Sequence, residues 1–271
     1  MCESLVMSWE EVADRCFRRR YDGFDVNTGV IAGRLGAVLI DTRASVPEGL
    51  ELREQLRELG FKAPVAVVNT HGHFDHCFGN AAFDGPFWGH LDLPGYLERE
   101  AWRTLAEDDP DWALQVEGTP VTAPSRLVRD TALIDLGDRI VELHHLGRGH
   151  TGHDLLVRVP DCGLVFAGDL VEEAGPPCYG SDSFPLDWPI TLTRLLGLEP
   201  DLIVPGHGDP VGARFVERQR DAIASVALGI RETYDAGLDP LKALRSGDWP
   251  YDPALLLHAV RRGHLQLAAS G

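Results

Sequence analysis

Four side chains that can bind a metal ion lie within six residues of this chain, in the sequence His71-Gly72-His73-Phe74-Asp75-His76. They directly follow the apolar run of residues 64–68, whose valines predict a buried β-strand. Loops at the carboxyl ends of strands are where open α/β sheets hold their ligands. Zinc, iron and manganese accept imidazole and carboxylate ligands, and His71 and His73 can both turn toward one ion. The motif therefore predicts a metal site at the end of a strand.

The same pattern of apolar strand, glycine and candidate ligand recurs further along the chain. His150, Asp169 and His207 each follow a run of apolar residues. Glycine lets the backbone turn sharply and approach an ion closely. The glycines that adjoin candidate ligands are Gly72, Gly149, Gly168 and Gly206. A strand that ends in one polar group indicates a site rather than a surface, so these three residues join the candidate ligands.

In their order along the chain, these residues resemble the metal signature of the metallo-β-lactamase superfamily. The matching positions are His71, His73, Asp75, His76, His150, Asp169 and His207. The resemblance runs from about residue 27 to about residue 211 and implies an αββα sandwich, with two mixed sheets face to face and the site at one edge. It also implies that His71, His73 and His150 hold one metal. Asp75, His76 and His207 would hold the second metal, and Asp169 would bridge the two ions.

Two divalent ions a few ångströms apart need an anionic bridge, which Asp169 and a bound hydroxide together can supply. A water shared by two such ions should ionise near neutral pH and attack a polarised carbonyl or phosphoryl centre. One metal would stabilise the developing oxyanion, and Asp75 would have the catalytic role of orienting the nucleophile. We expect two divalent metal ions as cofactors, with zinc preferred and iron or manganese as alternatives.

The chain is therefore predicted to be a metal-dependent hydrolase that uses a metal-bridging hydroxide on a small ester, thioester, lactone or related substrate. Many true β-lactamases of the family carry cysteine or serine at the position of Asp169, which makes penicillin hydrolysis a lesser alternative. A second enzyme class is a mononuclear iron oxidoreductase of the persulfide-dioxygenase kind, which one iron per chain would indicate. A structural metal site without an open coordination position is the non-enzyme alternative.

Composition sets limits on the partners and on the compartment. The net charge of -17 and the isoelectric point near 4.9 disfavour nucleic acid and anionic membranes, which this surface would repel. The expected partner is a small-molecule substrate, and the oligomeric state is left open. No secretory signal and no apolar stretch long enough to span a bilayer is visible. The cysteines lack paired or CxxC spacing and indicate free thiols in the cytoplasm: Cys2, Cys16, Cys77, Cys162 and Cys178.

The chain fits one metallo-β-lactamase-like domain, residues 1–271, of the α/β (α+β) class, with a four-layer αββα sandwich. We expect its core at about residues 22–212 and a C-terminal helical extension at residues 213–271, which closes the outer layer. A separate substrate-binding domain is the alternative for that extension. Helices are predicted at residues 12–20, 47–59, 191–196, 214–234 and 253–267, with a helix start at 79–83. Strands are predicted at residues 27–32, 37–40, 64–68, 132–134, 140–143, 155–159 and 164–166.

Other segments and side chains have two interpretations each. The insertion at residues 93–127, helical at first and irregular later, either covers a pocket or packs through its tryptophans. Asp154 either hydrogen-bonds a ligating histidine or serves as a turn residue. His90 is expected to be a hydrogen-bonded strand-end residue, with lining of the pocket as the alternative. Tyr179, in the loop 172–188 that is placed to shape the substrate mouth, either donates to an oxyanion or packs. The basic run 18–20 is expected on a solvated face.

Overall fold

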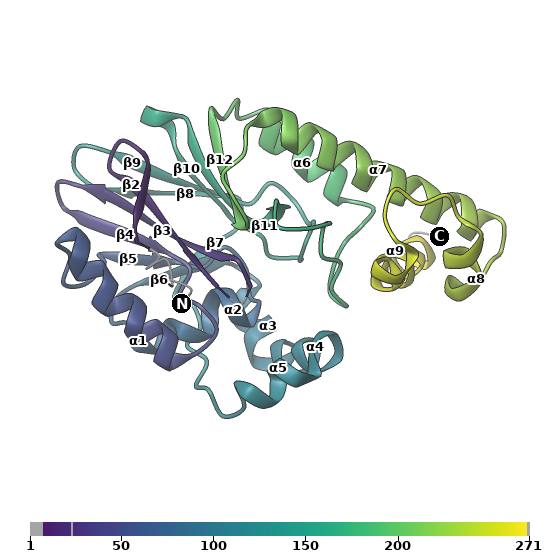
Figure 1. Cartoon of the computed structure of the whole chain (residues 1–271), viewed down its shortest axis with the longest axis horizontal. Coiled ribbons are helices and arrows are strands. Elements are labelled where there is room, and N and C mark those ends of the chain that lie inside the picture. The colour runs from purple at the N-terminus through teal and green to yellow at the C-terminus, as the bar shows by residue number, and fades with distance from the viewer. Residues whose placement is uncertain (1–7, 23, 270–271) are drawn as a thin grey trace, which may run out of the picture.

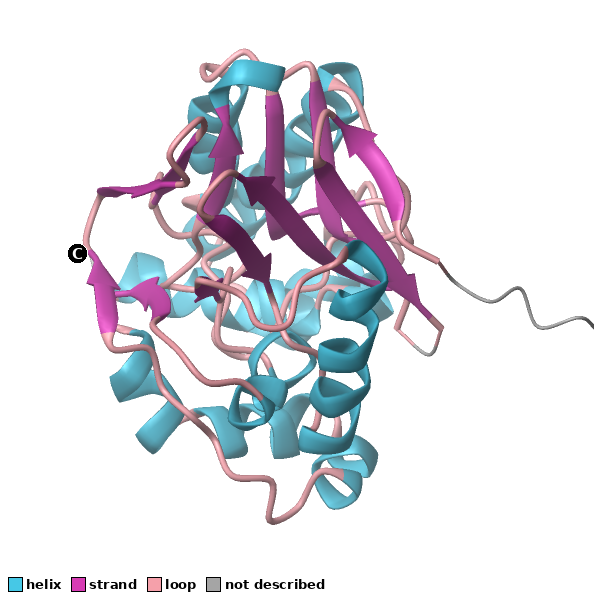
Figure 2. Cartoon of the chain, turned by 90° about the vertical axis from the view of Figure 1, so that its left-hand side faces the viewer, coloured by secondary structure: helices cyan, strands magenta, loops and turns pink. Residues whose placement is uncertain are grey.

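Apolar strands build two β-sheets that pack face to face in the computed structural model of the chain (Figures 1 and 2). The structure describes residues 8–22 and 24–269. The first sheet consists of β1 (Glu10–Ala13), β2 (Cys16–Tyr21), β3 (Val26–Gly33), β4 (Gly36–Ile40), β5 (Ala66–Val68), β6 (Phe87–His90) and β7 (Arg126–Val128). The second sheet consists of β8 (Thr131–Asp135), β9 (Ile140–His144), β10 (Leu156–Val159), β11 (Leu164–Glu172) and β12 (Leu202–His207).

The order of the strands brings three strand ends to one edge. The path runs β7-β6-β5-β4-β3-β12-β11-β10-β9-β8, with β2 paired to β3 from Val26 to Ile31 and β1 paired to β2. β4 to β7 are parallel to one another, and β11 and β12 are parallel as well. The two sheets join where His207 of β12 is in register with Val26 of β3. Because β3 is antiparallel to both β4 and β12, the carboxyl ends of β5, β11 and β12 meet at this edge.

Helices cover the outer face of each sheet. The helices are α1 (Val46–Gln55), α2 (Phe74–Cys77), α3 (Leu93–Arg99), α4 (Ala101–Asp108), α5 (Pro110–Gln115), α6 (Trp188–Leu196), α7 (Ala213–Asp235), α8 (Pro240–Ser246) and α9 (Leu257–Ala268). The described residues also form 3-10 segments at Leu56–Leu59, Phe78–Ala82, Pro160–Cys162 and Pro253–Leu255. The helix predicted at residues 47–59 is α1 with its 3-10 continuation, and the start predicted at 79–83 is a 3-10 turn.

Three apolar clusters separate the four layers. Ile31 and Val157 belong to a buried cluster that fills the space between the two sheets. Leu52 of α1 belongs to a second cluster, on the outer face of the first sheet. Leu192 of α6 and Val216 of α7 belong to a third, on the outer face of the second sheet. Since each sheet buries both faces, its strands need apolar residues on both sides, and the predicted αββα sandwich is confirmed.

The insertion between β6 and β7 packs on the first sheet's edge through its aromatic residues. Its helices α3 to α5 enclose a fourth apolar cluster with α2. The Trp102 ring centroid lies 5.0 Å from that of Phe78, and the Trp112 centroid lies 4.5 Å from that of Phe24. The tryptophans therefore pack, as one of the two interpretations predicts, and the segment is helical at first and irregular later.

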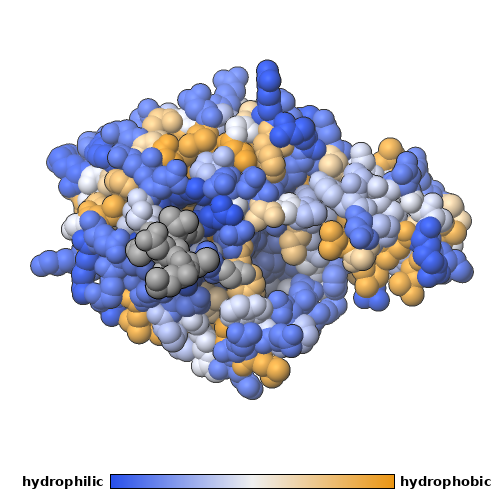
Figure 3. All heavy atoms as spheres, in the orientation of Figure 1, coloured by the Kyte–Doolittle hydropathy of each residue, from blue (hydrophilic) through white to orange (hydrophobic). Residues whose placement is uncertain are grey.

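The C-terminal helices divide into two parts. The first half of α7 packs on α6 over the second sheet, whereas α8 and α9 gather at the far end of α7 (Figure 1). The prediction of an outer-layer helix thus holds for α7, but α9 packs on α7 and not on the strands. The face in Figure 3 is mostly hydrophilic, with apolar side chains gathered over these C-terminal helices. No helix in the described residues is long and apolar enough to cross a membrane. The division at residue 213 stays a prediction.

The helix predicted at residues 12–20 is wrong. These residues form the hairpin of β1 and β2, and β2 pairs along its whole length with β3. Arg18 and Arg19 are buried, not solvated as predicted. The Arg18 guanidinium lies 2.9 Å from Asp209, and that of Arg19 lies 3.0 Å from Glu58. Partners this distant in sequence neutralise the basic run, which allows it to form a buried strand.

The cysteines of the described residues are free thiols, as predicted. Cys16 and Cys77 are buried, Cys162 is half-buried and Cys178 is exposed. Cys2 lies outside the described residues. The sulfur atoms of Cys16 and Cys162 are 3.9 Å apart, which is well beyond a disulfide bond length.

Candidate metal centre

Glycines bring the candidate ligands together at the edge where β5, β11 and β12 end. The backbone at Gly168 has φ +52°, a left-handed conformation that interrupts the register of β11 with β12. A Cβ atom at Gly206 would lie 1.8 Å from Asp169 Oδ1. A Cβ atom at Gly72 would lie 2.6 Å from the ring of Tyr96. Larger residues at positions 72 and 206 would therefore displace the side chains that surround the site.

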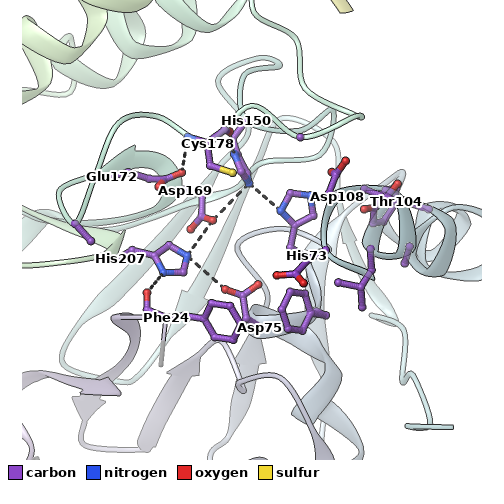
Figure 4. A pocket seen from close by; sticks show the side chains of 18 residues that line it. Phe24, His73, Asp75, Thr104, Asp108, His150, Asp169, Glu172, Cys178 and His207 are labelled. Carbon is purple, nitrogen blue, oxygen red and sulfur yellow. Dashed lines mark hydrogen bonds and ion pairs between the residues drawn. The ribbon is translucent and has the colours of Figure 1, made fainter. Parts of the chain in front are cut away.

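The first group of candidate ligands consists of His71, His73, His150 and Asp169, whose ligand atoms lie within 4.8 Å of one another. His150 Nε2 is 2.8 Å from His73 Nδ1. Asp169 Oδ2 lies 3.4 Å from His150 Nε2 and 3.6 Å from His71 Nε2. Figure 4 shows His73, His150 and Asp169 turned toward one another from three different segments.

The second group consists of Asp75, His76 and His207, again with ligand atoms within 4.8 Å of one another. Asp75 Oδ2 lies 3.4 Å from Nε2 of His76 and 3.4 Å from Nε2 of His207. Asp169 Oδ1 is 3.1 Å from His76 Nε2, and Asp169 Oδ2 is 3.2 Å from His207 Nε2. The carboxylate of Asp169 thus lies between the two groups (Figure 4).

Each of the five histidines has an oxygen atom at its outer ring nitrogen. His76 Nδ1 lies 2.8 Å from Asp41, and His73 Nε2 lies 3.2 Å from Asp182. In the other three histidines the outer nitrogen is Nδ1. It lies 3.1 Å from Thr70 Oγ1 in His71, 3.0 Å from the Cys178 carbonyl oxygen in His150 and 2.6 Å from the Phe24 carbonyl oxygen in His207. Carboxylate and carbonyl oxygens only accept, and the Thr70 hydroxyl donates to Asp41, so every outer nitrogen can carry the proton. The inner nitrogen of each histidine then presents a lone pair to the centre.

These inner lone pairs favour a cation. Two unprotonated nitrogens face each other at 2.8 Å in the pair His73–His150 and at 3.3 Å in the pair His76–His207, which is repulsive without a positive charge between them. His71 Nε2 and Asp169 Oδ1 are buried and have no hydrogen-bond partner in the described residues. Buried polar atoms without partners are costly, and a metal ion would satisfy them. Imidazole and carboxylate donors suit zinc and other first-row divalent ions.

The electrostatics of the metal-free cluster show the same demand for positive charge. Burial lowers the pKa of His150 to about 4, and His73 adds to this shift. For His207, burial lowers the pKa but the Asp169 carboxylate outweighs it and raises the value to about 10. Protons at His207 thus balance the buried carboxylates when metal is absent. A bound metal ion would displace such protons.

The two groups lie at the floor of a cavity of about 400 Å³. Its walls are largely apolar and come from Phe24, from Phe74 of α2 and from Tyr96 and Leu105 of the insertion. Residues of the loop 172–188 complete the wall, including Glu172 and Cys178. The loop 172–188 therefore lines the candidate site, as predicted. The insertion both packs through its tryptophans and lines the cavity, so its two interpretations hold together.

Three other side chains with two interpretations now have definite places. Asp154 accepts from the backbone N–H of Thr151 at 3.0 Å and is a turn residue of the loop that carries His150. His90 ends β6, accepts from the N–H of Asp92 at 3.3 Å and lies outside the lining of the cavity. Tyr179 is buried against Trp188, with ring centroids 5.2 Å apart, so it packs.

The sequence interpretation missed Asp41, Asp182 and Glu172. Asp41 directly follows the strand predicted at residues 37–40, and its left-handed backbone, with φ +58°, turns it toward Thr70 and His76. Asp182 lies 109 residues from His73, and no local pattern in its loop indicates the contact. Glu172 lines the cavity, and burial followed by the Asp169 carboxylate raises its pKa to about 8. Its place beside His207 follows from strand register, which only the fold supplies.

Comparison with known proteins identifies the family. The family model described as the metallo-beta-lactamase superfamily matches residues 21–207. The chain belongs to the metallo-beta-lactamase superfamily. Its similarity to human acyl-coenzyme A thioesterase MBLAC2 is 26% identity over 217 residues, which cover 72% of this chain and 77% of that protein. A metallo-beta-lactamase type 2 from Bacteroides fragilis is 26% identical over 133 residues, covering 48% of this chain and 53% of that protein.

Two solved structures share the fold of this chain. The inverting sec-alkylsulfatase Pisa1 from Pseudomonas sp. superposes with a TM-score of 0.75 at 17% identity and covers 96% of this chain. This chain spans 50% of the length of that alkylsulfatase. A metallo-beta-lactamase from Pontibacter korlensis gives a TM-score of 0.64 at 20% identity, covering 80% of this chain and 99% of that one. The predictions of the superfamily, its fold and a metallo-β-lactamase-fold hydrolase are confirmed.

Proposed function

We propose that this protein is a dinuclear metal-dependent hydrolase of a small acyl thioester or ester. The observation that carries the proposal is the orientation of five histidines, each with an outer nitrogen at a fixed oxygen and an inner nitrogen turned to the centre. A structural site is closed by its ligands, whereas this cluster forms the floor of a cavity of about 400 Å³. The arrangement therefore supports catalysis better than it supports a structural metal.

The two groups of ligands define the proposed metal positions. His71, His73 and His150 would hold one ion, and Asp75, His76 and His207 would hold the other, with Asp169 between them. Bound divalent ions, zinc in the first place, would supply Lewis acidity toward a carbonyl oxygen and lower the pKa of the attacking water. Asp75 lines the cavity, where its carboxylate can accept a hydrogen bond from that water and orient it.

The walls of the cavity support an acyl substrate. Phe24, Phe74, Tyr96 and Leu105 would bury an apolar chain and exclude water from the reacting group. Each buried CH₂ group contributes about 0.8 kcal/mol to binding. The carbonyl carbon at the head of such a chain would lie beside the metal ligands. The thioester is the first choice because the similar human protein is named an acyl-coenzyme A thioesterase.

A substrate screen on metal-analysed protein tests the proposal. The panel comprises acyl thioesters, lactones, β-lactams, alkyl sulfates and phosphodiesters, each with protein that carries two zinc ions. We expect acyl thioesters to be hydrolysed with the highest kcat/KM. A preference for alkyl sulfates or β-lactams, or one bound iron per chain with oxygen consumption, would contradict it.

A further inference from the structure

A second cavity, of about 610 Å³, lies on the other side of Tyr96 and Asp182 from the metal centre. Four arginines line it, and they come from separate elements: Arg99 from α3, Arg103 from α4, Arg148 from the loop after β9 and Arg262 from α9. The chain as a whole has a net charge of -17. Four guanidinium groups in one hollow of such an acidic protein create a local positive field that concentrates anions. We call this cavity the arginine pocket.

The two inner arginines are held in place by an aromatic ring. The guanidinium carbon of Arg148 lies 4.3 Å from the ring centroid of Phe184, and that of Arg262 lies 5.1 Å from it. Arg262 Nε–H donates to the carbonyl of Ser183 at 2.9 Å, and its Nη groups have no hydrogen bond or ion pair to the described residues. Burial lowers the pKa of Arg262; the Asp182 carboxylate opposes this shift, and the like charge of Arg148 adds to it. The Nη groups of Arg262 therefore feel a carboxylate nearby, but no carboxylate of the described residues accepts a hydrogen bond from them.

The acidic residues of the arginine pocket do not neutralise it. Asp182 is engaged by His73 of the metal centre, at 3.2 Å. The Asp92 side chain is 73% exposed at the rim. Arg103 lies 3.7 Å from Glu100 and 3.4 Å from Glu107, and Arg99 lies 3.7 Å from Glu98. All of these side chains are exposed, so the three pairs are weak. Arg148 has one partner, Asp187 at 2.5 Å, which leaves its other donors available.

We propose that the arginine pocket binds phosphate groups. The planar guanidinium group can donate two hydrogen bonds to two oxygens of one phosphate. A carboxylate ligand has only two oxygens and one charge, so a pocket with four arginines suits phosphate groups better. The phosphate can belong to a free anion or to the substrate, since Tyr96 lines both the arginine pocket and the metal-centre cavity. The second source rests on the proposed thioester hydrolysis. It also gives α9 a role, because Arg262 is supplied by that helix.

Calorimetric titration with adenosine 3′,5′-bisphosphate tests the binding itself, on metal-loaded protein. This probe carries two phosphates and lacks a diphosphate that would chelate the metal. The variants are Arg262→Gln, Arg148→Gln and the matched control Arg261→Gln, which removes the same charge from an exposed neighbour on α9. We expect wild type and R261Q to bind equally, and R262Q and R148Q to bind about tenfold more weakly or worse. No binding by wild type, or wild-type affinity in both R262Q and R148Q, would overturn the proposal.

Steady-state kinetics distinguish the two sources of phosphate. The measured quantity is the ratio of KM for an acyl-coenzyme A to KM for the same acyl group on N-acetylcysteamine, which carries no phosphate. If the phosphate belongs to the substrate, the wild-type ratio is below one, R262Q raises it about tenfold and R261Q leaves it unchanged. If R262Q binds the bisphosphate more weakly but leaves this KM ratio unchanged, the arginine pocket binds a free phosphate anion and not the substrate. No hydrolysis of either thioester would refute the proposed function but leave the binding result intact.

Discussion

At the scale of residues, the two nitrogens of each central histidine have separate tasks. The outer nitrogen fixes the ring and its tautomer, and the inner nitrogen faces the centre. Asp41 does this for two neighbours at once, since it lies 2.8 Å from His76 Nδ1 and accepts from the Thr70 hydroxyl that faces His71. Carboxylate partners raise the basicity of a histidine ligand, so their loss should weaken metal binding without removing a ligand.

Replacing Asp182 should weaken the first ion selectively, whereas replacing Asp41 should weaken mainly the second ion. Asp182→Asn removes the anionic partner of His73 and should lower the affinity of the first ion about 10- to 100-fold. Asp41→Asn should lower the affinity of the second ion by a similar factor through His76, and that of the first ion less, through Thr70 and His71. Asparagine tolerates the left-handed backbone at position 41. Stepwise zinc affinities from competition with a chromophoric chelator measure both effects. The exposed Asp111→Asn is the control, and equal affinities in all variants would refute the partner roles.

The metal-free fold should lose stability in weak acid through His90. Burial and the nearby His145 lower the pKa of His90 to about 4, whereas in the unfolded chain it is near 6.5. Between these values the unfolded state binds more protons, so stability falls as the pH falls from about 6.5 toward 4. We predict that His90→Gln makes this decline shallower in urea unfolding at several pH values with a chelator present. An unaltered pH dependence in that variant would contradict the assignment.

Local sequence patterns decided which site residues could be predicted: His150, Asp169 and His207 each follow an apolar strand and a glycine. His71, His73, Asp75 and His76 stand out because they are crowded into one loop after an apolar strand. Asp182 could not be predicted, since its partner His73 lies 109 residues away and the loop that carries Asp182 has no regular pattern. Long-range pairing of this kind depends on the fold, which brings the insertion and the loop 172–188 to the same cavity.

At the scale of elements, the parallel pair β11 and β12 sets the position of the bridging candidate. Gly168 interrupts the register, and Asp169 follows it directly, pointing at the edge where the two sheets join. The adjacent backbone at Gly206 lies so close that only a hydrogen atom fits between it and the Asp169 carboxylate. Glycine is therefore required at position 206 because of the Asp169 carboxylate, and not because of the conformation of β12.

Gly206→Ala should damage the metal centre and spare the sandwich. Its Cβ would meet Asp169 Oδ1 at 1.8 Å, so the carboxylate must move away from both groups of ligands. We expect zinc content below two per chain and a large loss of thioester hydrolysis. The control is Gly212→Ala, where a Cβ atom meets nothing within 4 Å and stability should change by less than about 0.5 kcal/mol. Two zinc ions per chain in G206A, measured by metal analysis, would show that metal binding does not depend on the position of the Asp169 carboxylate.

Elements with clear local patterns were predictable, and one with a misleading pattern was not. The strands predicted at residues 27–32 and 37–40 are confirmed as β3 and β4, which pair as a hairpin. Residues 12–20 combine apolar and basic positions in a way typical of a helix, but they form a hairpin. The deciding contacts are the ion pairs of Arg18 with Asp209 and Arg19 with Glu58, which only the folded chain provides.

At the scale of the whole molecule, the proposed metals connect the two sheets. His71 to His76 follow β5 of the first sheet, whereas His150, Asp169 and His207 belong to the second. Two further features connect the sheets: the apolar layer between them, and the pairing of His207 in β12 with Val26 in β3. Ions that take ligands from both sheets would therefore resist their separation, and metal binding should stabilise the molecule as a whole.

Metal removal should lower the melting temperature. A ligand at 100 times its Kd stabilises a protein by about 2.7 kcal/mol, and about 2–4 °C per kcal/mol is typical at this size. We predict a loss of roughly 5–10 °C when a chelator is added to the zinc-loaded protein. Asp169→Ala should fold but lose most of this difference, because the bridge between the two groups is gone. Equal melting temperatures with and without chelator would mean that the ions do not connect the sheets.

The measurement that tests the account most directly is a zinc titration of the metal-free protein with thioester hydrolysis recorded at each step. The two groups of ligands predict that activity continues to rise until two equivalents of zinc are bound. Asp169→Ala should bind the second equivalent far more weakly and remain nearly inactive throughout. Maximal activity at one equivalent, or no thioester hydrolysis with two ions bound, would contradict a dinuclear thioester hydrolase.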